Sequence, residues 1–307
     1  MMRKLALPVL AAVARALLSR RTRRAIALVM GGLLVALGYV ALRPAPPGEK
    51  LTPKERERIY AALLKHVERG GPNHLHSRRL YHYAPPFAEA AGANVHVVQA
   101  AALLHDATKE DGKGEPKEKF CTHGEQGADL TKAVLSEIGK SETFTETASE
   151  AVREHMGPCG FNWSYLSRRF MSKFCDRRFP KPSSAEAKVL YDIDMLDLMT
   201  VDGVVKVAEL RQKNPEFEKE PLEASVRSGP DSAWKSVVDA KQTLLTEKAK
   251  SCGAALAEHT KIFVDGLDFA KVTDVPALKQ AAAAYLVASP LPSCLPVVPP
   301  LTDGPSP

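Results

Sequence analysis

The sequence predicts an all-α domain. Apolar residues recur at helical spacing in almost every segment from 52 to 288, while alternating strand patterns are scarce and β-branched runs are short. The chain has 307 residues, 45% hydrophobic and 25% charged, which excludes a disordered or fibrous protein. Its net charge of +6 owes much to seven basic residues in the first 24, so we expect no binding of nucleic acid.

Helices are expected one after another along this part of the chain. The first opens at Thr52, an N-cap residue followed by Pro53 and Glu55, and stops at Gly70 and Gly71. A charged loop with Gly and Pro at 108–119 and a turn at 179–184 interrupt the pattern. The same reasoning places further helices near residues 74–91, 95–109, 123–138, 143–155, 162–175, 184–206, 233–265 and 275–287.

The N-terminal part predicts a single transmembrane helix. Residues 25–42 form an uncharged run of 18, which as a helix would be about 27 Å long and would just span a bilayer core. We therefore expect a basic segment over 1–24, a membrane anchor over 25–43 and a Pro-rich linker over 44–50. A cleaved signal peptide and an organelle transit peptide are the alternatives.

The side of the membrane on which the domain lies stays open. The positive-inside rule puts the N-terminus in the cytosol and the domain outside, but by a thin margin, because Arg43 and Lys50 flank the other side. We expect a helical domain over 51–288 and a disordered tail over 289–307, where seven prolines remove backbone donors. Five scattered cysteines without a C-x-x-C pair exclude a disulfide scaffold and a zinc ribbon.

The adjacent residues His105 and Asp106 end an apolar helix and offer an imidazole nitrogen and a carboxylate oxygen. This donor set suits Mn²⁺, Fe²⁺, Co²⁺ or Mg²⁺ better than it suits a metal that prefers thiolates. His76 lies upstream in a helical segment, and Asp192 and Asp194 lie downstream in the stretch YDIDMLDLMTVDG. Three helices can therefore each supply ligands to one ion.

This pattern resembles the HD superfamily of metal-dependent phosphohydrolases, which combine a first His, a buried His-Asp pair and a distant Asp. Residues 105–109, HDATK, are similar to the family's H-D-x-G-K signature, with Thr in place of Gly or Ser. Residues 192–197, DIDMLD, resemble the D-A-D-R-L-D stretch of the bacterial nucleotide pyrophosphohydrolase branch, which is the closest branch. The resemblance covers about 70–265 and implies an HD-type helical bundle.

The resemblance also implies roles for individual residues. Asp194 is preferred to Asp192 because its spacing to Leu196 matches the branch, whereas Met195 stands where the branch has Arg. The implied ligands of one divalent cation are His76, His105, Asp106 and Asp194.

Two further histidines can hold a second metal ion or can orient a water molecule or a phosphate next to the first. His123 lies in HGEQGADL, which resembles the H-x-x-x-G element of the dinuclear branches, and His155 ends the following helix.

Catalysis and phosphate binding are expected from Asp106 and from nearby cations. Asp106 would hold the metal and orient the attacking water, and Lys109, one turn further on, would reach a phosphate. Arg78 and Arg79 lie within a turn of His76 and would bind phosphate, unless they form a solvated face.

The sequence therefore predicts a divalent-metal phosphohydrolase that cleaves a phosphomonoester or a nucleotide pyrophosphate. One alternative is a membrane-anchored HD module that binds a nucleotide or serves as a scaffold without catalysis. The other is a dinuclear hydrolase of dinucleoside polyphosphates, which would use His123 and His155 in addition.

Overall fold

The computed structural model describes residues 48–109, 117–156, 180–213, 219–229 and 232–301. Within these ranges the chain forms ten α-helices, one short π-helix and no strand, which confirms the all-α prediction for this part of the protein. The helices belong to the unit Glu49–Pro307.

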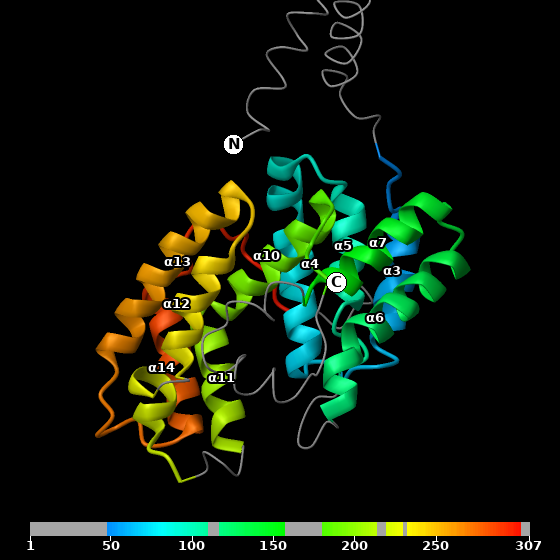
Figure 1. The fold of residues 1–307 in the computed structure, drawn as a ribbon. Coiled ribbons are helices and arrows are strands. Elements are labelled where there is room, and N and C mark those ends of the chain that lie inside the picture. The colour runs from blue at the N-terminus through cyan, green and yellow to red at the C-terminus, as the bar shows by residue number, and fades with distance from the viewer. Residues whose placement is uncertain (1–47, 110–116, 157–179, 214–218, 230–231, 302–307) are drawn as a thin grey trace, which may run out of the picture. The chain divides into compact units, whose positions relative to one another are not determined.

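Three helices lie at the centre of this unit: α4 (Pro72–Ala91), α5 (Val95–Leu104) and α10 (Ala185–Leu198) (Figure 1). On one side are α3 (Pro53–Leu63), α6 (Lys117–Glu137) and α7 (Glu142–Glu154). On the other side are α11 (Val201–Lys213), the π-helix η3 (Ala224–Ser228), α12 (Ala233–Thr243), α13 (Glu247–Gly266) and α14 (Val275–Ala288).

Apolar side chains fill both interfaces of the central helices. A smaller core joins α3, α5, α6 and α7 and includes the buried Ile59, Leu104 and Leu135. A larger core joins α4 and α10 to the later helices and includes Phe87 and Leu196. The central helices are therefore buried on both sides, which holds the side chains between them in place.

The first helix starts at the residue that the sequence predicts. The Thr52 side chain accepts a hydrogen bond from the Glu55 backbone N–H, and Glu55 accepts one from the Thr52 N–H, so α3 begins with a complete capping box. The helix ends at Leu63, however, before the expected stop at Gly70 and Gly71. Helix α5 likewise ends at Leu104, so that His105 is its C-cap.

Two long helices of the prediction are each divided in two. The expected helix 184–206 breaks at Thr200, whose hydroxyl donates to the Asp197 carbonyl and accepts from the Gly203 N–H. The expected helix 233–265 breaks at residues 244–246, where the Thr246 side chain caps α13. Threonine side chains therefore satisfy backbone groups at both breaks. The expected helix 162–175 lies outside the described residues.

Two glycines allow unusually close helix contacts. A Cβ atom on Gly203 would lie 2.2 Å from the Leu198 carbonyl oxygen, so α11 starts directly against the end of α10. A Cβ atom on Gly127 would lie 2.7 Å from the His105 carbonyl oxygen, so α6 packs against the end of α5. Any larger residue would push these elements apart.

The C-terminal segment corrects the prediction of a disordered tail. Residues 289–301 form no helix, but Leu295 is 4% exposed and Cys294 forms a disulfide with Cys252 of α13. The Arg78 guanidinium on α4 donates to the Pro300 carbonyl at 3.1 Å. This part of the tail therefore packs on the domain. The spacing of the cysteines did not predict the disulfide between Cys252 and Cys294.

No helix among the described residues is long and apolar enough to cross a bilayer. The anchor expected over 25–43 lies outside these residues.

The disulfide predicts a measurable contribution to stability. It closes a loop between positions 42 residues apart, and removing such a link costs about 2 to 4 kcal/mol through the larger entropy of the unfolded chain. We expect Cys294→Ser to lower the unfolding free energy by this amount in urea titrations of the full chain and to expose the tail to proteases. Equal midpoints for Cys294→Ser, Cys252→Ser and the unchanged chain would contradict this account.

Candidate metal centre

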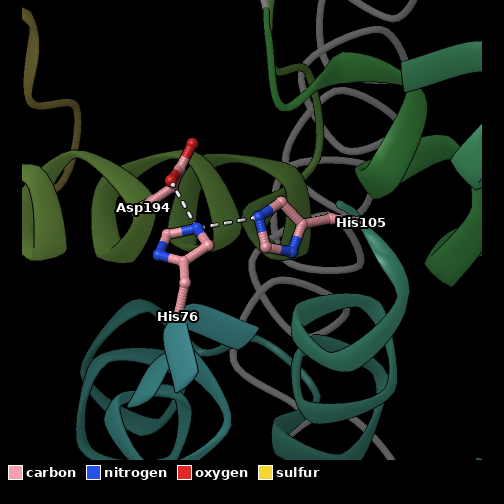
Figure 2. Close-up of side chains that lie close together, drawn as sticks. All are labelled: His76, His105 and Asp194. Carbon is pink, nitrogen blue, oxygen red and sulfur yellow. Dashed lines mark hydrogen bonds and ion pairs between the residues drawn. The ribbon is translucent and has the colours of Figure 1, made fainter. Parts of the chain in front are cut away.

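Six side chains from the central helices and their neighbours converge at one place. Five are buried, with exposures of 4% or less, and the Asp194 side chain is 20% exposed. Figure 2 shows His76 from α4, His105 from the end of α5 and Asp194 from α10 pointing toward one another. The full set is His76, His105, Asp106, His123, His155 and Asp194.

The first group in this cluster surrounds His76 Nε2. This nitrogen lies 3.2 Å from His105 Nε2 and 3.2 Å from Asp194 Oδ1 (Figure 2). Asp106 Oδ2 lies 3.9 Å from the same nitrogen and 3.7 Å from His105 Nε2. Ligands at about 2.1 Å from an octahedral cation lie roughly 3 Å from one another. The atoms of His76, His105 and Asp194 therefore have nearly the spacing of a shared coordination sphere, and the Asp106 oxygen lies slightly further from the two nitrogens.

The second group lies on the other side of the Asp106 carboxylate. Asp106 Oδ1 is 3.4 Å from His123 Nε2 and 3.7 Å from His155 Nε2. The two imidazole nitrogens are 3.2 Å apart. The four rings form a row, His76, His105, His155 and His123, whose neighbouring centres are 5.1 to 5.2 Å apart. Each oxygen of Asp106 thus faces a different pair of histidines.

Hydrogen bonds fix the tautomers of three of these rings. His105 Nδ1 donates to the Ala102 carbonyl at 2.9 Å, and His155 Nδ1 donates to the Val152 carbonyl at 2.5 Å. His76 Nδ1 donates to the Asp197 carboxylate at 2.8 Å. Because carbonyl and carboxylate oxygens only accept, each Nδ1 carries a proton, and in its neutral form each ring turns an Nε2 lone pair toward the cluster.

Lone pairs that face one another and face carboxylates repel unless a positive charge lies between them. A divalent cation supplies that charge, and imidazole with carboxylate is a common donor set of Mn²⁺, Fe²⁺ and Co²⁺ sites. The residues present therefore fit a metal ion.

The pKa values of the histidines in the cluster agree with a metal site. Burial lowers the pKa of His105 to about 4, so this ring is neutral at pH 7. Burial and Lys206 lower the pKa of His76, but hydrogen bonds to Asp194 and Asp197 outweigh them and raise it above its ordinary value. A cation at His76 Nε2 would therefore compete with a proton for that nitrogen.

The carboxylates stay ionised despite their burial. Burial raises the pKa of Asp106, but Lys109 and the neighbouring imidazoles outweigh it and hold the pKa well below the ordinary value. Burial likewise raises the pKa of Asp194, and His76 more than compensates. Both groups therefore offer charged oxygens to a cation.

The two candidate aspartates of α10 have separate roles. Asp194 lies in the cluster, as expected. Asp192 accepts hydrogen bonds from the Leu245 and Thr246 backbone N–H groups, both at 2.7 Å, and from the Thr246 hydroxyl at 2.6 Å. Asp192 thus holds the start of α13.

Sequence reasoning missed Asp197, which holds His76 from outside the cluster. Its carboxylate accepts two hydrogen bonds from the Arg79 guanidinium, at 2.6 and 2.8 Å, as well as the bond from His76. Burial raises the pKa of Asp197, but Arg79 and His76 lower it far below the ordinary value. The spacing of the two aspartates could have indicated this role. Asp197 follows Asp194 by three residues, and residues at that spacing lie on the same face of a helix.

The expected phosphate-binding cations lie in three different places. Lys109 Nζ is 3.2 Å from Asp106 Oδ2, so this ammonium lies at the cluster. Arg79 is engaged by Asp197, and Arg78 is turned toward the tail, where it contacts Pro300. A lysine that the prediction did not include among the site residues, Lys206 of α11, lies close enough to influence the charge of His76.

Comparison with known proteins assigns a domain to this region. Residues 74–199 match the family model of the HD domain. This range contains all six residues of the cluster, and the branch of the family is not distinguished. No curated protein sequence and no solved structure matches the chain significantly.

The cluster predicts tight binding of a divalent cation by the full chain. We expect His105→Ala to weaken Mn²⁺ or Co²⁺ binding by at least about 100-fold, because it removes a ligand and opens the site to water. Calorimetry after chelator treatment measures the affinity and the number of ions per chain. The control is His66→Ala, which changes an exposed histidine of the α3–α4 connection. Equal affinity of the two variants would contradict the assignment.

The contact between Asp197 and His76 predicts an indirect effect on the metal. We expect Asp197→Asn to weaken cation binding by about 10- to 100-fold, because the amide orients His76 less firmly and carries no charge. Arg79 loses its partner in this variant, so the double variant Asp197→Asn with Arg79→Met serves as the control. If the double variant recovered full affinity, the unpaired Arg79 charge would be the cause, and the role assigned to Asp197 would be wrong.

Proposed function

Starting from the HD domain that residues 74–199 contain, we propose that the chain is a divalent-metal-dependent phosphohydrolase. The observation that carries the proposal is the set of imidazole rings whose Nδ1 hydrogen bonds turn Nε2 toward the buried Asp106 carboxylate and the partly exposed Asp194 carboxylate. Such an arrangement is costly in an apolar interior and is stabilised by a bound cation.

The residues that would hold the cation are His76, His105, Asp106 and Asp194. When bound, a divalent ion lowers the pKa of water and neutralises charge on a phosphoryl group. Mn²⁺, Fe²⁺ and Co²⁺ suit two nitrogen and two oxygen ligands, whereas Mg²⁺, the other candidate, prefers oxygen ligands.

The chain's own residues would divide the remaining tasks. Asp106 accepts hydrogen bonds and is kept ionised, so it can orient a water molecule beside the phosphate. Lys109, whose ammonium is 3.2 Å from Asp106, can bind a phosphate oxygen. Arg79 and Asp197 keep His76 in the correct orientation and tautomer.

The proposed substrate is a small phosphate ester or anhydride, with a nucleotide as the first candidate. The resemblance to the nucleotide pyrophosphohydrolase branch supports this choice. Met195 stands where that branch has Arg, and it is 4% exposed, so this position offers no cation to a substrate. An anchor over 25–43 would hold the activity at a membrane, with a single span.

The second group supports another candidate function. Asp106 Oδ1 faces His123 and His155, so one carboxylate can bridge two cations. A pair of ions is a common device for stabilising both oxygens of a phosphoryl transfer. Two ions per chain in the calorimetric titration would favour a dinuclear hydrolase, for which dinucleoside polyphosphates are candidate substrates, over the mononuclear one.

The proposal is tested by turnover. We expect the full chain, purified in detergent and loaded with Mn²⁺, to release phosphate or pyrophosphate from a member of a panel of nucleoside mono-, di- and triphosphates and dinucleoside polyphosphates. His105→Ala should lose at least about 1000-fold in rate, because ordering of water and charge neutralisation are lost together, while His66→Ala should keep its activity. A metal-loaded chain that binds nucleotides without cleaving any would contradict the proposal and favour a non-catalytic HD module.

A further inference from the structure

Lys206 belongs to α11, which lies beyond the residues that match the HD domain. It is half-buried, and no salt bridge joins it to a residue in the described part of the chain. A lysine in such a position normally finds a carboxylate partner, because burying an unpaired ammonium is costly.

The close contact between α10 and α11 determines where Lys206 lies. A Cβ atom on Gly203 would be 2.2 Å from the Leu198 carbonyl oxygen and 2.7 Å from that of Asp197, so this approach requires glycine. The Thr200 hydroxyl also joins the Asp197 carbonyl to the Gly203 N–H. The first turn of α11 is therefore held against the end of α10 that carries Asp194 and Asp197, and Lys206, three residues after Gly203, lies on the same face of α11 in the next turn.

Charged groups of the candidate metal centre lie near Lys206. Burial and the nearby Lys109 ammonium lower the pKa of Lys206, while Asp106, Asp197 and Asp194 act in the opposite direction. The charge of Lys206 in turn lowers the pKa of His76. Two lysines from different elements, Lys109 and Lys206, thus lie near the same carboxylates.

The balance of charge indicates what these lysines can bind. In the described part of the chain, the nearby buried or half-buried charged groups are three carboxylates, Asp106, Asp194 and Asp197, and three cations, Arg79, Lys109 and Lys206. Asp202 is exposed and acts on Arg79 and Asp197, so solvent screens part of its charge. A divalent ion added to this balanced set leaves an excess of about two positive charges in a partly buried site. A phosphomonoester dianion matches that excess, whereas a phosphodiester carries one negative charge.

We propose that Lys206 is a second cationic contact for the phosphate of the substrate, together with Lys109, and that the pair selects a terminal phosphate dianion. This inference rests on the proposed function, because it names the class of substrate for the same site. Lys206 would bind the substrate without holding the metal.

The test uses methyl phosphate and dimethyl phosphate as probes of the Mn²⁺-loaded full chain in a calorimeter. We expect the unchanged chain to bind methyl phosphate at least about 10-fold more tightly than dimethyl phosphate. Lys206→Met should weaken methyl phosphate binding about 10- to 100-fold, in the range of a lost hydrogen bond between charged groups. It should not weaken Mn²⁺ binding, because it removes a positive charge near the metal and no metal ligand. Lys206→Arg should recover most of the affinity, and Lys241→Met, an exposed lysine on α12, should have no effect.

The outcomes separate this inference from the proposed hydrolysis. If Lys206→Met bound methyl phosphate as tightly as the unchanged chain, or if the unchanged chain preferred dimethyl phosphate, the inference would be wrong. If phosphate binding depended on Lys206 but no nucleotide were cleaved, the inference would stand and the hydrolase would fail. Lys206→Gln replaces Lys206→Met in the same comparison if circular dichroism shows that the methionine variant is unfolded.

Discussion

The candidate metal centre depends on groups that offset the negative charge of one buried carboxylate, that of Asp106. Asp106 is 3% exposed, and its two oxygens face different pairs of imidazoles. An ionised carboxylate at this depth requires positive charge or hydrogen-bond donors around it. Lys109 supplies part of this charge, but three neighbouring rings present lone pairs, because their Nδ1 protons are used elsewhere. A cation in the cluster satisfies the carboxylate and the rings together.

Helix α10 connects this centre to the rest of the domain through three aspartates with different tasks. Asp192 holds the start of α13, Asp194 joins the cluster, and Asp197 pairs with Arg79 and orients His76. The helix contributes many buried residues to the larger apolar core, so the three carboxylates are fixed relative to one another. The close start of α11 against its end extends the same rigidity to Lys206.

Much of the fold and of the cluster could be predicted, because helical periodicity and the His105-Asp106 pair are local features of the sequence. The break at Thr200 could not, because the buried Met199 and Val201 continue the apolar pattern across it. The tail was wrongly expected to be disordered over 289–301, since prolines exclude helix but do not prevent burial of Leu295 or a disulfide at Cys294. Arg78 and Arg79 share a helix turn with His76, and only the fold shows that their partners are Pro300 and Asp197.

The central claim is that these side chains share a cation. Anomalous X-ray scattering from crystals of the full chain grown with Mn²⁺ tests it most directly. The account predicts a peak at about 2.0 to 2.3 Å from His76 Nε2, His105 Nε2 and an oxygen of both Asp106 and Asp194. A well-ordered chain with manganese peaks only elsewhere, or with a solvent-free contact between protonated His76 and His105, would contradict it.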